Sequence, residues 1–254
     1  MPARSRPKNK VKKFPCVIVK MGKFYVVGTP IGNLEDMSLR ALRVLKEVDL
    51  ILCEDTRVTK KLLARHLIKT PTESYHQWSR GGKIDRILNF LNAGKNLALV
   101  SDAGTPGISD PGERLIGSIY AEFGEKVQVI PIPGPNAALS ALSVSGLPAD
   151  SFVFLGFLPH KKGRQTALRE IASTTETVVL YESPHRILKT LGTLAETLKP
   201  QRTIVVGREI TKMFEEFKRG QPTEVYDYFL KHPEKVRGEF VVIVSKTQTR
   251  YNSD

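Results

Sequence analysis

Apolar and polar positions alternate with two distinct periods along the chain from residue 24 onward. Apolar residues recur at every third position from residue 39 to residue 48, which is the spacing of one helix face, and Ser38 before them is a suitable N-cap. Short β-branched and apolar runs favour buried strands. In the first half the pattern predicts strands at 24–27, 50–53, 73–75, 97–100 and 127–130. It predicts helices at 38–48, 56–67 and 84–91, and a fourth helix that follows the turn at 101–112 and ends at about residue 123.

The second half continues the alternation. Its pattern predicts strands at 152–155, 177–180, 204–206, 214–219 and 240–244, and helices at 163–172, 183–198 and 223–230. Such alternation is typical of α/β proteins with a largely parallel sheet. Residues Ser145 to Pro148 read as the connection between the halves. We therefore expect an N-terminal α/β domain at 23–146 and a C-terminal α/β domain at 147–246, flanked by tails at 1–22 and 247–254.

The composition suits a globular protein of one or two domains. Of the 254 residues, 41% are hydrophobic and 26% are charged, which is enough to bury a core. The two cysteines, Cys16 and Cys53, make no disulfide framework, and this favours a reducing cytoplasm. The sequence has no run of about 18 apolar residues, and its basic N-terminus lacks the apolar segment of a secretory signal. We expect neither a membrane helix nor export.

The positive charge is concentrated at the N-terminus. The net charge is +13, and residues 1–23 hold eight lysines and arginines with no acidic residue, which leaves +5 for the remainder. Such a tail is either an arm attracted to phosphates or a solvated extension without a partner. The tail alone does not identify a function.

Three expected strand ends carry glycine- and proline-rich turns, at 28–36, 101–112 and 131–137. In open α/β sheets, ligands bind beyond the carboxyl ends of strands, where glycine permits close approach and proline makes turns rigid. The first loop has neither the Gly-Lys-Ser/Thr of a phosphate-binding loop nor the glycine spacing of a dinucleotide site. One such turn is often an ordinary strand-to-helix connection, but three indicate a different kind of ligand site.

Six motifs resemble one known family. Phe24–Asp36, Asp102–Gly112 and Pro133–Ala137 resemble the cofactor loops of tetrapyrrole methylases. Three later segments are similar to the branch of this family that methylates the ribose of a cytidine in 16S rRNA: Gly156–Pro159, Tyr181–Arg186 and Arg208–Lys212. The resemblance runs from about residue 22 to residue 245. It implies the tetrapyrrole-methylase fold, two α/β domains with the cofactor cleft between them, a homodimer, and S-adenosylmethionine-dependent 2′-O-methylation in the small ribosomal subunit.

The resemblance also assigns cofactor-binding residues. From the first domain it implies Pro30, Ile31, Gly32, Asp102, Gly104, Thr105, Pro106, Asn136 and Ala137, and from the second Tyr181 and Phe240. The sulfonium and ammonium groups of S-adenosylmethionine favour carboxylate and carbonyl acceptors. Asp102 either supplies one or caps its own turn. Relatives commonly have serine where this chain has Asn136, so hydrogen bonds there are expected to differ in placement.

A ribose hydroxyl is a poor acid, so a nearby base or cation assists methyl transfer. Candidates in polar segments of the second domain are Glu182, Glu209, Lys212, Glu215 and Glu216, of which Glu182 and Lys212 lie in the family-like motifs. We take Glu182, Lys212 and Glu216 as the candidate catalytic residues. Each of them is equally suited to a structural ion pair.

RNA recognition requires phosphate contacts and stacking on an unpaired base. We expect phosphate contacts from Arg57, Lys161, Arg186 and Arg208, and Trp78 is suited to stacking or to packing. Arg57 belongs to a basic group at helical spacing with Lys60, Lys61 and Arg65, which is also typical of a solvated helix face. The five histidines show no metal-ligand spacing, and we expect no metal.

Two other functions fit parts of this pattern. A methyltransferase acting on a small tetrapyrrole requires a closed apolar cleft, and the basic residues near the motifs argue against it. A non-catalytic RNA-binding factor in ribosome assembly would share the basic surface, so that transfer of a methyl group to RNA is the property that separates it from the enzyme.

Overall fold

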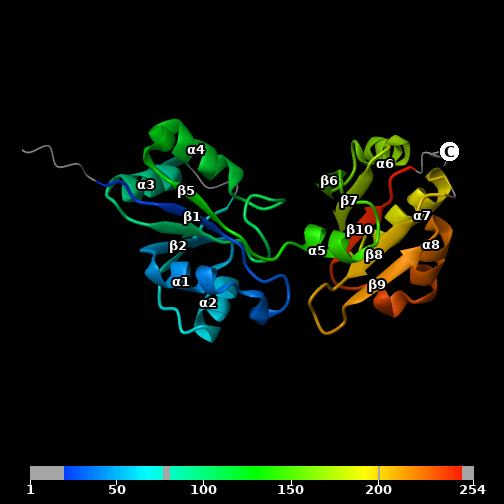
Figure 1. Cartoon of the computed structure of the whole chain (residues 1–254), viewed down its shortest axis with the longest axis horizontal. Coiled ribbons are helices and arrows are strands. Elements are labelled where there is room, and N and C mark those ends of the chain that lie inside the picture. Colours follow the sequence, from blue (N-terminus) through cyan, green and yellow to red (C-terminus); the bar gives the residue numbers. More distant parts are fainter. Residues whose placement is uncertain (1–19, 77–80, 200, 248–254) are drawn as a thin grey trace, which may run out of the picture.

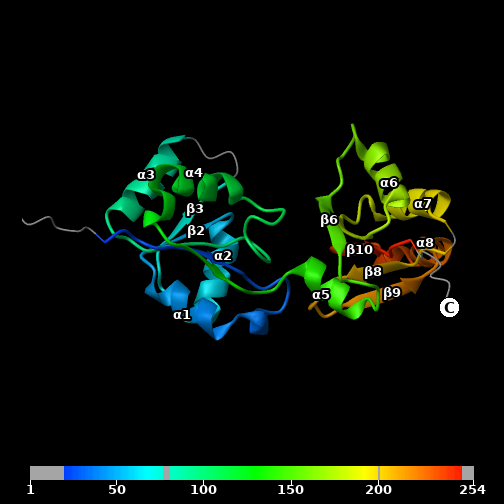
Figure 2. The same cartoon turned by 45° about the horizontal axis from the view of Figure 1, so that its top comes forward.

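The computed structural model describes residues 20–76, 81–199 and 201–247. Cys16, Trp78 and most of both expected tails lie outside these residues. The described chain forms two lobes, each built on a five-stranded sheet, which are joined near helix α5 (Figures 1 and 2). The expected α/β fold is confirmed.

The N-terminal sheet is entirely parallel. Its strand order is β3 (Thr72–Ser74), β2 (Leu50–Cys53), β4 (Leu97–Leu99), β1 (Phe24–Val27) and β5 (Val129–Ile132). Two clusters of buried side chains fill the two faces. One face is covered by α1 (Leu39–Glu47) and α2 (Thr56–Arg65), and the other by α3 (Gly81–Asn92) and α4 (Glu113–Phe123). The carboxyl ends of all five strands therefore point to one edge.

The C-terminal sheet is mixed. Its order is β6 (Phe152–Phe157), β7 (Thr177–Glu182), β10 (Phe240–Val244), β8 (Ile204–Arg208) and β9 (Glu216–Gly220). Only β6 and β7 pair in parallel. One face is covered by α6 (Arg164–Ser173), α7 (Ile187–Thr197) and α8 (Pro222–Lys231). Three 3₁₀ turns complete the described elements, at Leu34–Asp36, Gly124–Lys126 and Pro233–Lys235.

Helix α5 (Ala137–Val144) was not predicted from the sequence. Its sequence, AALSALSV, is largely apolar on all sides and gives no amphipathic signal. The helix packs against β7 and β10, on the sheet face opposite α6, α7 and α8. The expected domain boundary at 146/147 stays a prediction, and this packing favours a boundary before α5.

Two expected elements have different bounds in the structure. The strand expected at 127–130 is β5, Val129–Ile132, which includes Pro131. A proline is tolerated there because β5 is an edge strand, and only one of its sides pairs with β1. The helix expected from residue 183 begins at Ile187, because β7 runs on to Glu182 and a turn follows it. Ser38 caps α1 as expected, accepting a hydrogen bond from the backbone N–H of Ala41 at 3.1 Å.

Candidate functional site

The three glycine- and proline-rich loops meet at the edge of the N-terminal sheet. Thr29 and Gly104 form an isolated antiparallel bridge, with N···O distances of 2.8 and 3.1 Å. Gly28 and Gly134 pass so closely that a Cβ on either would lie 2.8–2.9 Å from backbone atoms of the other. Only glycine fits at these two positions. Thr105 Oγ1 completes the assembly by donating to the carbonyl of Pro135 at 3.3 Å.

A cavity of about 390 Å³ lies between these loops and the C-terminal sheet. Eight of the expected cofactor-binding residues line it: Ile31, Asp102, Gly104, Thr105, Asn136, Ala137, Tyr181 and Phe240. Pro30 lines a neighbouring hollow beside α2, which meets the cavity at Asp102. Pro106 is buried in its loop, and Gly32 lies under the side chain of Lys212. The volume is within the roughly 300–1,000 Å³ of small-molecule sites.

Asp102 joins two strand ends at this cavity. Its Oδ1 accepts a hydrogen bond from the backbone N–H of Asp55 at 3.0 Å. Asp55 in turn caps α2, accepting from the backbone N–H of Arg57 at 2.8 Å. In the described part of the chain only one oxygen of Asp102 is engaged in this way, and the side chain is exposed to the cavity. A capping role and a ligand role are therefore compatible.

Asn136 caps helix α5. Its Oδ1 accepts from the backbone N–H of Leu139 at 3.1 Å. Asparagine and serine are similarly effective N-caps. Asn136 therefore holds the start of α5 at the cavity as a serine would.

The C-terminal half supplies an aromatic wall. Tyr181 lies with its ring centroid 5.1 Å from that of Phe154 and 5.5 Å from that of Phe157. Its hydroxyl accepts from the backbone N–H of Ala138 at 3.3 Å. Burial, aided by the negative charge of Asp110, raises the pKa of Tyr181. Tyr181 therefore remains a neutral phenol in the physiological pH range.

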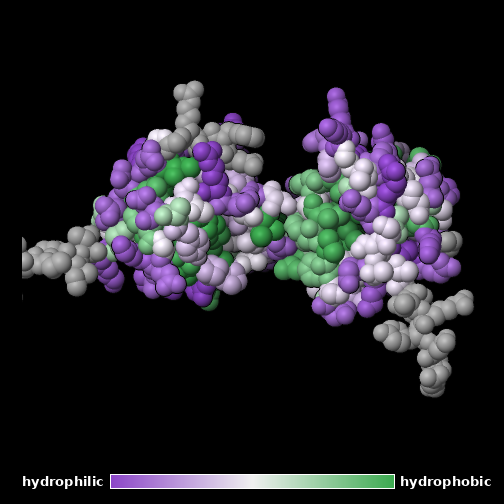
Figure 3. All heavy atoms as spheres, turned by 90° about the horizontal axis from the view of Figure 1, so that it is seen from above, coloured by the Kyte–Doolittle hydropathy of each residue, from purple (hydrophilic) through white to green (hydrophobic). Residues whose placement is uncertain are grey.

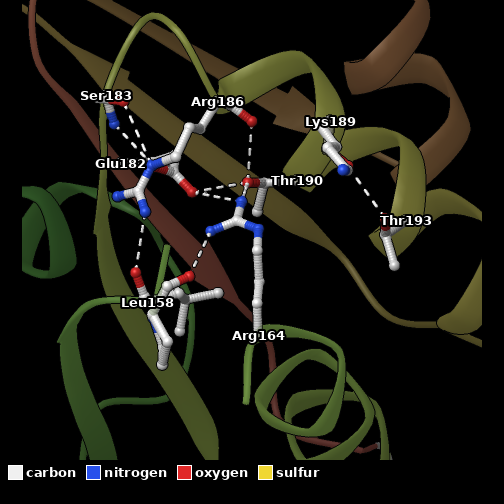
Figure 4. A network of polar contacts seen from close by, with 9 residues as sticks. Leu158, Arg164, Glu182, Ser183, Arg186, Lys189, Thr190 and Thr193 are labelled. Atoms are coloured by element: carbon white, nitrogen blue, oxygen red, sulfur yellow. Dashed lines mark hydrogen bonds and ion pairs between the residues drawn. The ribbon is translucent and has the colours of Figure 1, made fainter. Parts of the chain in front are cut away.

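Glu182 is the centre of a buried polar network (Figure 4). Its side chain is 0% exposed, and its carboxylate lies 2.9 Å from Nη2 of Arg164 and 2.8 Å from Nε of Arg186. It also accepts from Thr190 Oγ1 at 2.6 Å and from the backbone N–H of Ser183 at 2.9 Å. The carboxylate borders the cavity, but these four contacts already engage both of its oxygens. This arrangement suits a residue that positions the Tyr181 wall.

Lys212 connects the two halves of the chain. Its Nζ lies 2.9 Å from Oε1 of Glu209 and 2.7 Å from Oε2 of Glu239. Its Cγ would lie 2.4 Å from a Cβ placed on Gly32, so only glycine fits beneath it. Burial alone would lower the pKa of Lys212, but hydrogen bonds to the two carboxylates outweigh it and raise that pKa. Lys212 therefore stays protonated in the physiological pH range and cannot act as a proton acceptor.

The backbone around Lys212 is strained. Glu209 and Thr211 have φ values of 51° and 68°, which non-glycine residues rarely adopt. Strain of this kind concentrates at functional sites, where the surrounding structure holds it in place. Here it directs Ile210 into the cavity and Lys212 over Gly32.

Glu216, the third candidate catalytic residue, does not line the cavity. Its Oε1 lies 2.6 Å from Nζ of Lys235 and also accepts from the Tyr228 hydroxyl. Burial would raise the pKa of Glu216, but these hydrogen bonds outweigh it and lower that pKa. Arg208, opposite Glu216 in the β8–β9 ladder, is 9% exposed with its Nε 3.5 Å from the carboxylate. The structure thus places both residues in a structural ion-pair group.

The four expected RNA contacts divide into two kinds. Arg57 and Lys161 are exposed, although Arg57 also pairs with Asp55. Arg186 is mostly buried, since it holds Glu182 and donates to the carbonyl of Leu158 at 2.9 Å. Arg208 is buried as described above. Only the exposed pair is free to reach a phosphate.

Three carboxyl groups at the cavity were missed by sequence reasoning: Glu54, Asp110 and Glu239. Glu54 directly follows β2, and Asp110 lies in the loop after β4. Burial, together with the negative charges of Asp110 and Asp102, raises the pKa of Glu54 to about 7. Burial also raises the pKa of Asp110 to about 6, against a hydrogen bond from Ser101 that lowers it. The position of Glu54 at the carboxyl end of a parallel strand was the available signal.

Within 20–76, 81–199 and 201–247, no three or more His, Cys, Asp or Glu side chains are grouped so as to hold a metal ion. The helices in the same ranges are all too short or too polar to cross a membrane.

Residues 23–225 match the family of Tetrapyrrole (Corrin/Porphyrin) Methylases. The chain is 49% identical over 227 residues to Ribosomal RNA small subunit methyltransferase I of Synechocystis sp., a match covering 89% of this chain and 79% of the relative. It is 45% identical over 225 residues to the protein of the same name from Thermotoga maritima, covering 89% and 99%.

Solved structures share the fold at lower identity. The cobalt precorrin-4 methyltransferase of cobalamin biosynthesis superposes with a TM-score of 0.64 at 16% identity, covering 88% of this chain and 94% of that one. Uroporphyrin-III C-methyltransferase from Thermus thermophilus, in complex with S-adenosyl homocysteine, superposes with a TM-score of 0.59 at 21% identity, covering 88% and 97%.

Proposed function

Because this chain belongs to the tetrapyrrole methylase family, we propose that it is an S-adenosylmethionine-dependent methyltransferase that modifies the 2′-hydroxyl of a cytidine ribose in 16S rRNA of the small ribosomal subunit. The observation that carries the proposal is 49% identity, over 89% of the chain, to a ribosomal RNA small subunit methyltransferase. The cytoplasm, where small subunits are assembled, is the proposed place of action.

The cavity suits this cofactor chemically. S-adenosylmethionine supplies a methyl group on a positively charged sulfonium and also carries an ammonium group. Asp102 and Asp110 line one part of the cavity and provide negative charge. Ile31, Ile108 and Val241 line other parts and provide apolar surface for an adenine ring. The close approach of Gly28 and Gly134 holds the loops that make this cradle.

Glu182 and Lys212 are proposed to hold other parts of the site in place and not to contact the reacting atoms. Glu182, fixed by Arg164 and Arg186, holds the end of β7 and therefore the Tyr181 wall. Lys212 keeps the two halves in register over Gly32 and binds Glu239, which lines the cavity. Correct alignment of the attacking oxygen, the methyl carbon and the sulfur contributes roughly 7–11 kcal/mol to barrier reduction in well-oriented reactions.

The RNA is proposed to lie across exposed basic residues on both halves. Helix α2 exposes Arg57, Lys60, Lys61 and Arg65 beside the cavity, and Lys161 lies in the exposed loop between β6 and α6. Phosphate contacts of this kind supply sequence-independent affinity. Arg186 and Arg208 are proposed to support the site and not to contact RNA.

The proposed function is tested by incubating the protein with methyl-labelled S-adenosylmethionine and small ribosomal subunits from cells lacking this modification. We expect label in 2′-O-methylcytidine after RNA digestion. Binding to the subunits without label would support an assembly factor instead. Label that appears only in an added tetrapyrrole would support the small-molecule enzyme.

Replacing Lys212 by alanine is expected to slow turnover while S-adenosylmethionine still binds. The variant loses the hydrogen bonds from Lys212 to the carboxylates of Glu209 and Glu239, and a hydrogen bond to a charged group is worth about 1.5–3 kcal/mol. A barrier raised by this amount lowers kcat about 10- to 100-fold. The matched control is Lys231→Ala, which removes a lysine from the exposed end of α8. Single-turnover methylation and calorimetric titration with the cofactor measure the two effects, and a wild-type rate in Lys212→Ala would remove Lys212 from the mechanism.

The homodimer is proposed to form through β6. This strand is at the edge of its sheet and exposes Phe152, Val153, Leu155 and Phe157. Figure 3 shows a broad hydrophobic area on the C-terminal half, in the region where Figures 1 and 2 place β6. An exposed apolar edge strand favours pairing with another chain. Phe157 also lines the cavity, so a second copy seated there would border the site.

Leu155→Glu is expected to convert the dimer to a monomer, because it places a charge in the middle of this apolar strand. Leu230→Glu on α8 is the control, since Leu230 is more exposed, at 53% against 40%, and lies on another surface. Sedimentation equilibrium of the wild type and both variants measures the state. A monomeric wild type, or a dimeric Leu155→Glu variant, would contradict the assignment of β6.

A further inference from the structure

Glu54 lies where the cavity meets the basic surface of α2. It directly follows β2 and lines the cavity, and α2 begins two residues later at Thr56. The side chain is half-buried, and the backbone N–H of Asp102 donates a hydrogen bond to its carboxylate. Arg57 in the first turn of α2 is exposed. Glu54 is therefore next to both the proposed cofactor site and the proposed RNA surface.

We propose that Glu54 is the general base of methyl transfer, and that its carboxylate accepts the proton of the attacking ribose 2′-hydroxyl. This assignment rests on the proposed function of the cavity. As the bond between the ribose oxygen and the methyl carbon forms, the bond between that carbon and sulfur breaks and its electron pair stays on sulfur. The proton passes to Glu54 and then to solvent, so no further reactant is required.

The acidic candidates of the C-terminal half are either engaged by cations or outside the cavity. Both oxygens of Glu182 are held by arginines and by further donors. Glu209 and Glu239 bind the ammonium of Lys212, and Glu216 lies outside the cavity beside Lys235. A carboxylate held by cations is a weak proton acceptor, because the pairing stabilises its charged form.

The surroundings of Glu54 have the opposite character. The charged groups that act on it are Asp102, at the end of β4, and Asp110, in the loop that follows. From the C-terminal half, the neutral hydroxyl of Tyr181 and the carboxylate of Glu239 share the cavity. Burial and the two aspartates raise the pKa of Glu54 to about 7. A general base is most effective when its pKa is close to the working pH.

The first test compares single-turnover methylation of small subunits by the wild type and by Glu54→Gln. Glutamine keeps the hydrogen-bond acceptor for Asp102 N–H but cannot take up the proton. We expect the rate to fall about 10²- to 10⁴-fold, with calorimetric affinity for S-adenosylmethionine retained. The wild-type rate should rise with pH through about 7, in line with the pKa of Glu54, and this dependence should be lost in the variant.

A second readout does not depend on activity. A carboxyl group whose pKa is raised by folding stabilises the protein below its unfolded-state pKa, and that contribution is lost as the pH rises through the folded-state value. For Glu54 this interval runs from the ordinary glutamate pKa of 4.5 to a pKa of about 7. Glu54→Gln should therefore melt at a higher temperature than the wild type at about pH 8, and this gain should disappear toward about pH 4.5.

Two further variants define the effect. Asp110→Asn removes a negative neighbour, so it should move the acid limb of the rate profile to lower pH. Glu47→Gln removes an exposed carboxylate paired with Arg43 at the end of α1, and it should leave the profile unchanged.

Three outcomes would overturn the proposal for Glu54: a wild-type rate in Glu54→Gln, an acid limb that persists in that variant, or a loss of cofactor affinity with the single-turnover rate unchanged. Failure of the proposed function has a separate signature, since the wild type itself would then place no label in RNA.

Discussion

Replacing Glu182 by alanine is expected to lower the free energy of unfolding by about 3–5 kcal/mol, the usual cost of removing one partner from a buried ion pair. The side chains of Arg164 and Arg186 are only 6% and 15% exposed. Without the carboxylate, two guanidinium groups would remain largely dehydrated with no negative partner. Thr190 and the N–H of Ser183 would each lose a hydrogen-bond acceptor as well.

Chemical denaturation of the wild type and Glu182→Ala measures this loss. Glu170→Ala is the matched control, because Glu170 is exposed on α6 in the same lobe, and its loss should cost little. The experiment also separates two roles of Glu182. A variant with full stability and greatly reduced turnover would assign Glu182 to the chemistry, whereas a large loss of stability is the result expected of a positioning residue.

Sequence patterns located most strands and helices because each has a local signal. Ser38 before an apolar period marked α1, and the β-branched runs marked β7, β8 and β10. Helix α5 was missed because its apolar residues follow no single face: Ala138, Ala141 and Leu142 are buried against the C-terminal sheet, whereas Leu139 and Val144 are exposed. Its existence depends on the tertiary packing that covers it.

The site was predictable to a different degree on each side of the cavity. On the N-terminal side, glycines and prolines at strand ends indicated the three loops, since these residues have special backbone geometry. Glu54 follows β2 without such a turn and was overlooked, although it occupies the same edge of the sheet. On the C-terminal side, Tyr181 and Phe240 came from family resemblance alone.

Charged residues were the least predictable class. Glu182 pairs with Arg164, 18 positions earlier in another element, and no local pattern indicates such a pair. Arg186 and Arg208 are of the residue type expected to contact RNA phosphates, yet in the folded chain both of them pair with carboxylates. The sequence gives the number of charges, whereas burial decides which of them remain free to meet a ligand.

Replacing Asp102 by asparagine is expected to weaken binding of S-adenosylmethionine about 10- to 100-fold. Asparagine can still accept the hydrogen bond from the backbone N–H of Asp55, so the end of β2 and the start of α2 should remain in place. What disappears is the negative charge at the cavity. A hydrogen bond to a charged group contributes about 1.5–3 kcal/mol, which corresponds to that change in Kd.

Asp102→Ala removes both the charge and the acceptor, and it should bind the cofactor no better than Asp102→Asn and melt at a lower temperature. Asp85→Asn, on the exposed face of α3, is the control for loss of one carboxylate elsewhere. Calorimetric titration of the four proteins measures Kd directly. If Asp102→Asn bound the cofactor as tightly as the wild type, Asp102 would only tie β2 to β4, and the negative charge that favours the cofactor would have to come from Asp110.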